Sequence, residues 1–224
     1  MKAFVECSSP AAVIDRDNVD TDMIVRIERM TTLKRGQFGP WAFEMLRYRP
    51  DGSEDPSFVL NREPFRQAKI LIAGDNFGCG SSREMAVWAL DDFGIRCVIA
   101  QSYGDIFYNN CFQNGLLPIQ LPAGQCSALA GIARDGTIVH VDLRSCTVRA
   151  GSMEVSFCIP AFRREALLNG WDDIDQSLAL AAEIDGVPAV LDVTDRASVE
   201  AFAAGLPDDV TLLVNNAGMA LGQE

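Results

Sequence analysis

A glycine-rich turn contains the residues of this chain whose types and spacing are best suited to chemistry. The apolar run Ile70–Ala73 is expected to form a strand that leads into the turn, and an amphipathic helix is expected at Ser82–Phe93. The first backbone N–H groups of a helix have no partner within the helix and favour an anion. Because Ser81 and Arg83 lie at this junction, the turn could hold a carboxylate and place a hydroxyl group beside it.

The same residues also allow a purely structural interpretation. Ser81 and Glu84 have the spacing of a capping box, in which the serine serves only to cap the helix. Arg83 argues the other way, because a cation in the first helical turn opposes the helix dipole and is better explained by function. The spacing of Gly78 and Gly80 lacks the third glycine of a dinucleotide-binding fingerprint. Spacing alone therefore leaves a catalytic and a capping role open for Ser81.

Several segments resemble the small-subunit family of 3-isopropylmalate dehydratases (isopropylmalate isomerases) in the aconitase superfamily. The segment Gly74–Glu84 is similar to the signature of that family, and the likeness extends from about Ala12 to about Leu180. The other matching segments follow in the same order along the chain: Asp15–Asp22, Lys34–Pro40, Phe58–Asn61, Asp105–Phe112, Asn114–Ile119 and Leu167–Ile174.

The resemblance implies a fold, a reaction and a partner. The expected fold of residues 1–184 is α/β, a swivelling β/β/α domain of the aconitase C-terminal type with a parallel βαβαβ core. The implied reaction interconverts 2-isopropylmalate and 3-isopropylmalate by dehydration and rehydration, in leucine biosynthesis. In the family a [4Fe–4S] cluster belongs to the large subunit, so this chain is expected to bind no metal and to act only in a heteromeric complex.

The resemblance also implies roles for individual residues. Ser81 corresponds to the family's catalytic base, and a serine needs nearby positive charge and hydrogen-bond donors to take a proton at neutral pH. Arg83 is expected to grip a substrate carboxylate with its planar fork, with Ser82 and Gly80 beside it. The remaining substrate-binding residues implied by the resemblance lie in a loop of the isopropylmalate type: Phe38, Gly39 and Pro40.

Departures from the family pattern leave alternatives open. Met85 and Val87 stand where the family usually has histidine and proline, and Val25–Ile27 replaces the usual proline and lysine. The chain could therefore serve a related hydro-lyase acting on homoaconitate, citraconate or dimethylmalate, or be a non-catalytic fusion relic. We expect Met85 to pack in the core.

Composition excludes several other classes of function. A net charge of −12 over 224 residues argues against nucleic acid as a partner. No apolar run approaches the ~18 residues of a membrane span, so a cytoplasmic protein without membrane contact is expected. Seven cysteines without a C-x-x-C pair indicate reduced thiols and argue against a cluster held by this chain alone. The single histidine, His140, is expected on a strand.

The middle of the chain is expected to form a parallel sheet. Predicted strands and helices alternate, and ligands of such sheets bind beyond the carboxyl ends of the strands. The strands are Ile70–Ala73, Arg96–Ala100 and Leu116–Leu121, and the helices between them are Ser82–Phe93 and Gly104–Asn114. A helix to Ala133, three antiparallel strands (Val139–Leu143, Cys146–Arg149, Met153–Ile159) and helices at Ala161–Leu168 and Asp173–Ile184 are expected to follow.

Two N-terminal segments are irregular. The acidic residues of Asp15–Asp22 resemble a calcium loop, but Asp20 stands where such a loop needs glycine and Arg26 where it needs glutamate. A loop held by side-chain-to-backbone hydrogen bonds is the favoured interpretation. Thr31–Pro56 is interpreted as a mobile surface loop that recognises a substrate.

The C-terminal segment 185–224 is expected to be a separate extension. It resembles a βαβ fragment of a short-chain dehydrogenase, with strands at Val187–Asp195 and Val210–Gly218 and a helix at Arg196–Gly205. The fragment lacks the glycine-rich turn and the Tyr-x-x-x-Lys pair of that family, which argues against a nicotinamide-dependent oxidoreductase.

Overall fold

A computed structural model describes residues 1–172, 174–178 and 195–205 of the chain. Met1–Trp171 form one compact unit, and Asp172 begins a second. In the second unit, α9 (Arg196–Ala204) confirms the helix expected near Arg196. The two strands expected in the extension, and the 184/185 boundary, lie outside the described residues. None of the described helices is long and apolar enough to cross a membrane.

A mixed sheet of seven strands forms the centre of the compact unit, in the order β4-β3-β2-β1-β5-β6-β7. The strands β1 to β4 are parallel, and β1, β5, β6 and β7 pair in antiparallel fashion. This arrangement confirms the expected α/β fold with its parallel core and antiparallel excursion. The strand bounds are β1 Glu6–Ile14, β2 Ile70–Ala73, β3 Cys97–Ala100, β4 Leu117–Gln120, β5 Ile138–Asp142, β6 Thr147–Ala150 and β7 Met153–Ser156.

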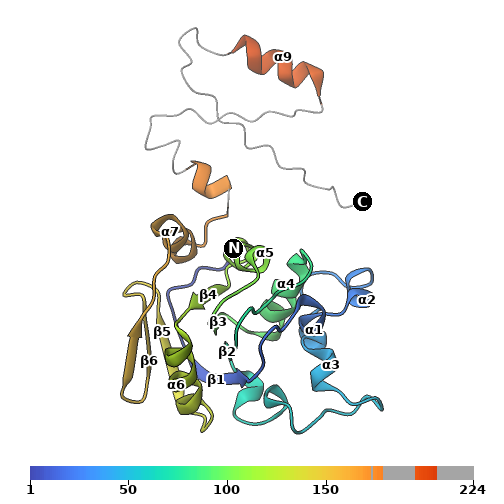
Figure 1. The fold of residues 1–224 in the computed structure, drawn as a ribbon. Coiled ribbons are helices and arrows are strands. Elements are labelled where there is room, and N and C mark those ends of the chain that lie inside the picture. Colours follow the sequence, from blue (N-terminus) through green and yellow to red (C-terminus); the bar gives the residue numbers. More distant parts are fainter. Residues whose placement is uncertain (173, 179–194, 206–224) are drawn as a thin grey trace. The chain divides into compact units, whose positions relative to one another are not determined.

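Helices cover both faces of the parallel strands (Figure 1). Alternate residues of β2 point to opposite faces, so Leu71 packs in a cluster with α4 and Ile72 packs in another with α6. The long helices of the compact unit are α4 Glu84–Phe93, α5 Asp105–Gln113, α6 Ala123–Ala133 and α7 Ala161–Asn169. The short helical turns are α1 Thr21–Ile24, α2 Ile27–Met30, η1 Gly39–Trp41, α3 Glu44–Arg47, η2 Val59–Asn61 and η3 Phe65–Gln67.

The central strand β1 was not expected from the sequence. Pro10 lacks an N–H group and would normally exclude a central strand position. Next to it, the Ser9 hydroxyl oxygen accepts a hydrogen bond from the Lys69 backbone N–H at 2.9 Å, which connects β1 to the start of β2. The alternation of buried and exposed residues along β1 is nevertheless that of a sheet strand. This strand joins the parallel half of the sheet to the antiparallel half.

Smaller expectations are also resolved. Met85 is partly buried and packs against the core, as expected. His140 lies on β5, where its Nδ1 and the Ser8 hydroxyl are 2.7 Å apart. All seven cysteines are free thiols, as their spacing indicates.

Candidate functional site

The glycine-rich turn begins directly after β2, at the carboxyl end of the parallel strands. Gly78 has a φ of 72°, and a Cβ atom there would overlap the ring of Phe107. A Cβ atom on Gly74 would overlap the Asp17 carboxylate. The glycines therefore allow the turn to pass close to α5 on one side and to the N-terminal loop on the other.

Backbone hydrogen bonds attach the N-terminal loop to this turn. The Gly78 N–H donates to the Val19 carbonyl at 2.7 Å, and the Thr21 N–H donates to the Cys79 carbonyl at 2.9 Å. The Ser81 N–H donates to the Thr21 hydroxyl oxygen at 3.2 Å. Hydrogen bonds between two segments about 60 residues apart in the sequence thus support the backbone at Ser81.

The acidic residues of the N-terminal loop each have a different partner. Asp17 accepts a hydrogen bond from the Asp75 N–H at 2.7 Å, and Asp20 caps α1 by accepting from the Met23 N–H at 2.8 Å. Asp15 forms an exposed ion pair with Arg134, and Asp22 pairs with Arg83. The loop therefore turns on side-chain-to-backbone hydrogen bonds, as the favoured interpretation predicted.

The three small residues of the turn are exposed. Gly80, Ser81 and Ser82 all lie on the surface before α4 begins. The helix starts at Glu84, two residues later than expected, because Arg83 keeps an extended backbone with φ −116° and ψ 103°. Two exposed serines therefore precede the N-terminus of α4, where the helix dipole favours negative charge.

The capping box between Ser81 and Glu84 does not form. Arg83, rather than Ser81, occupies the N-cap position, and no side chain caps the helix there. The Glu84 carboxylate instead accepts a hydrogen bond at 2.9 Å from the side chain of the buried Asn114. The Ser81 hydroxyl thus has no part in starting the helix.

Arg83 is the buried cation of the site. The residue is only 9 % exposed, and its guanidinium forms an ion pair with the carboxylate of Asp22. Within the part of the chain that the structure describes, this is the one ion pair or hydrogen bond of its side chain. Asp22 engages one edge of the guanidinium fork, so other N–H groups of Arg83 remain for an anion.

The pairing of Arg83 with Asp22 was not predicted. The sequence signal for it was the segment Asp20–Asp22, whose resemblance to the family was noted without a role for these side chains. Thr21, which is 1 % exposed and supports Ser81, belongs to the same segment.

A polar network extends the site along the ends of the neighbouring strands. The Ser102 hydroxyl donates to the Asp75 carboxylate at 2.5 Å and accepts from the Asn76 N–H at 2.9 Å. Asn76 in turn donates from its side chain to Asn18 at 2.8 Å. These bonds connect the segments after β1, β2 and β3 at their carboxyl ends.

The predicted loop residues are placed very differently from the turn. Phe38 is completely buried and its ring lies 6.1 Å from that of Trp88 on α4, measured between centroids. Gly39 is buried against the backbone carbonyl of Asp92, where a Cβ atom would not fit. Only Pro40 is exposed. Phe38 would have to leave the core to touch a substrate, so direct binding by this residue stays a prediction.

The thiol of Cys79, which lies in the glycine-rich turn, is unsuited to ionisation. Burial raises the pKa of Cys79, and the negative charge of Asp20 raises it further. Among the described residues, no three or more histidine, cysteine, aspartate or glutamate side chains are grouped to hold a metal ion. The donor set of the described chain therefore does not fit an iron–sulfur cluster, which needs several thiolates.

Comparison with known proteins points to one family. Residues 1–124 match the Aconitase C-terminal domain. The 3-isopropylmalate dehydratase small subunit of Gluconacetobacter diazotrophicus is 52 % identical over 188 residues, which are 83 % of this chain and 91 % of that protein. The 3-isopropylmalate dehydratase of Rhizopus niveus is 50 % identical over 186 residues, which are 82 % of this chain but 25 % of that longer protein.

The fold has a counterpart among solved structures. The 3-isopropylmalate dehydratase of Methanocaldococcus jannaschii superposes with a TM-score of 0.61 at 26 % identity. The superposition covers 81 % of this chain and 99 % of that one.

Proposed function

Because this chain belongs to the 3-isopropylmalate dehydratase small-subunit family of the aconitase superfamily, we propose that it provides the proton-transferring half of a hydro-lyase in leucine biosynthesis. The proposed reaction interconverts 2-isopropylmalate and 3-isopropylmalate by removing water and adding it back in the other orientation. The observation that supports the proposal is that Ser81 is exposed, takes no part in capping α4 and lies two residues before the buried Arg83.

Proton abstraction next to a carboxylate is the step assigned to this chain. Ser81 takes the proton from carbon and returns it during rehydration. Its alkoxide form needs stabilisation, which the N–H groups at the start of α4 and the guanidinium of Arg83 supply. Arg83 also binds a substrate carboxylate through the donors that Asp22 leaves unused, and Ser82 adds a hydrogen bond.

Expulsion of hydroxide is the step assigned to the partner. A [4Fe–4S] cluster on the large subunit would supply the Lewis acid that lets hydroxide leave. The Rhizopus niveus protein supports a division of this kind, since the region similar to this chain occupies only a quarter of its length.

The test is reconstitution with the large subunit from the same genome. The complex should interconvert the two isopropylmalates, whereas the isolated chain should show neither activity nor stoichiometric iron and sulfide under anaerobic conditions. A cluster bound by the isolated chain would contradict the division between the subunits. Parallel assays on homoaconitate, citraconate and dimethylmalate would show whether the Val25–Ile27 and Met85 departures have changed the substrate.

A further inference from the structure

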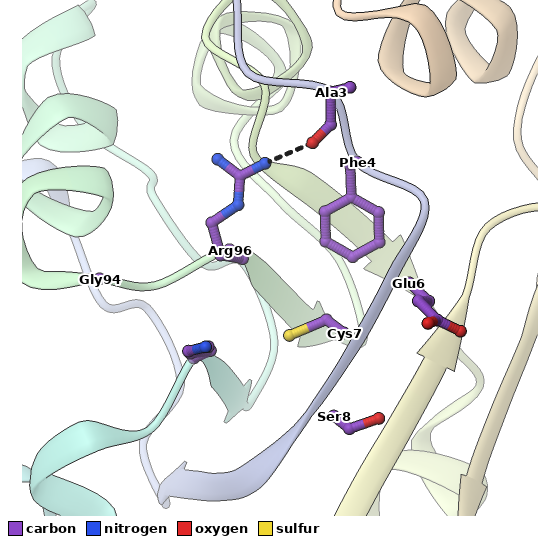
Figure 2. A pocket seen from close by; sticks show the side chains of 8 residues that line it. Ala3, Phe4, Glu6, Cys7, Ser8, Gly94 and Arg96 are labelled. Carbon is purple, nitrogen blue, oxygen red and sulfur yellow. Dashed lines mark hydrogen bonds between the residues drawn. The ribbon is translucent and has the colours of Figure 1, made fainter.

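A cavity lies at the opposite end of the parallel strands from Ser81. Its volume is about 370 Å³, within the range of roughly 300–1,000 Å³ typical of small-molecule pockets. Lys69 immediately precedes β2 and Arg96 immediately precedes β3, so the cavity faces the amino ends of these strands. Figure 2 shows Phe4, Cys7 and Arg96 around it.

Two cations on neighbouring strands line this cavity. The backbone N–H of Arg96 donates to the backbone carbonyl of Lys69 at 2.8 Å. The two residues therefore lie side by side on adjacent strands, which are roughly 5 Å apart. Among the described residues, the Lys69 ammonium has no hydrogen-bond or ion-pair partner. Arg96 donates to the Ala3 carbonyl at 3.2 Å and lies 3.5 Å from the Asp91 carboxylate. Lys69 is exposed, so its ammonium group is free to move toward an anion that lies beside Arg96.

The side chains of β1 and of the residues before it point to different sides of the cavity. In Figure 2 the Cys7 sulfur points to the side where Arg96 lies, whereas the Glu6 carboxylate and the Ser8 hydroxyl extend to the opposite side. The one carboxylate of the lining thus points away from Arg96. Ala3, which is exposed, and the small exposed part of Phe4 contribute an apolar side to the lining.

The pKa of the Cys7 thiol responds to the positive charges of Lys69 and Arg96. The thiol is 8 % exposed, and burial raises its pKa, while the positive charges of Lys69 and Arg96 lower it. Both cations are therefore close enough for their charge to reach the sulfur.

We propose that the cavity formed by Phe4, Cys7, Lys69 and Arg96 binds a small organic carboxylate, at a site separate from the Ser81 turn. The two cations hold the carboxylate group, and Ala3 with the exposed edge of Phe4 receives a short apolar chain. The apolar side of the cavity favours such a ligand over inorganic phosphate, which has polar oxygens on every side.

The test uses the full-length chain and calorimetric titration with 3-methylbutanoate. The neutral 3-methylbutanamide and inorganic phosphate serve as comparison ligands. We expect saturable binding of the carboxylate and about tenfold weaker binding by Lys69→Gln, because one charged contact is lost. Arg62→Gln, which removes an exposed positive charge elsewhere, should bind like the unaltered chain.

Thiol labelling locates the ligand independently. Bound carboxylate should slow the reaction of Cys7 with N-ethylmaleimide, measured peptide by peptide, and leave the exposed Cys158 unaffected. Three results would each overturn the proposal: no saturable binding, equal binding of the amide or phosphate, or loss of binding in Arg83→Gln with full binding in Lys69→Gln.

Discussion

Two segments of the predicted site are placed very differently in the fold: Gly80–Ser82, which contains the predicted base Ser81, and the predicted substrate-binding segment Phe38–Pro40. Both were expected to contact substrate. The first is exposed throughout, whereas the second hides Phe38 and Gly39 and exposes only Pro40. The difference shows that one irregular segment can lie on the surface while another is part of the core.

The physical reason lies in how each segment is held. The turn before α4 is supported by backbone hydrogen bonds from below, such as Gly78 to Val19, so its side chains need not pack. The segment around Phe38 has no strand beside it and is held by its side chains and by Asp92 on α4. That carboxylate accepts from the Gly36 and Phe38 N–H groups at 2.8 and 2.9 Å. Such a loop must bury its aromatic residues to be ordered.

The comparison predicts that Ser81→Ala changes the rate and leaves stability unchanged. In the reconstituted enzyme, turnover should fall about 1,000-fold, since no other hydroxyl is assigned to take the proton. Melting temperature should stay at the unaltered value because Ser81 does not cap α4. Ser82→Ala, at the neighbouring exposed hydroxyl, should reduce turnover far less. A lower melting temperature with normal turnover would reverse the roles given to this segment.

Arg83→Lys should have the next largest effect. Lysine keeps the charge but cannot engage both Asp22 and a substrate carboxylate through a planar fork, so kcat/KM should fall about 100-fold. Circular dichroism should show an unchanged fold, which separates the loss from unfolding. Activity close to that of the unaltered enzyme would show that charge alone is sufficient at this position.

Phe38→Ala should act on stability. Removing a fully buried ring costs about 3–5 kcal/mol, which corresponds to a fall of roughly 10 °C in melting temperature. The KM of the folded fraction should change less than about twofold. Pro40→Ala is the matched control with little expected effect on melting. If Phe38→Ala instead raises KM and melts normally, the residue contacts substrate and the contrast with the turn disappears.

Deletion of Gly186–Glu224 should have the smallest effect. The compact unit ends at Trp171, and the matching motifs end before Gly186, so neither turnover nor the main melting transition should shift. Reduced soluble expression of the truncated chain would show that the extension completes the fold.

Local sequence signals predicted most of the parallel core. The strand Ile70–Ala73 and the helix stop at Gly94 agree with the structure, because apolar runs and glycine punctuation reflect nearby backbone preferences. The central strand β1 was missed because Pro10 and Ser9 are poor strand residues in isolation. Only pairing with β2 and β5, both distant in the sequence, makes it a strand.

The sequence by itself led to the prediction that Ser81 and Arg83, at a glycine-rich strand–helix junction, carry the chemistry, because their segment resembles the signature of a family with a known reaction. Tertiary structure decided which contacts Ser81 and Arg83 make. It freed the Ser81 hydroxyl from the capping box by engaging Glu84 with Asn114, and it paired Arg83 with Asp22. These outcomes depend on contacts across about 30 and 60 residues, which spacing along the chain cannot encode because only the folded sheet brings those segments together.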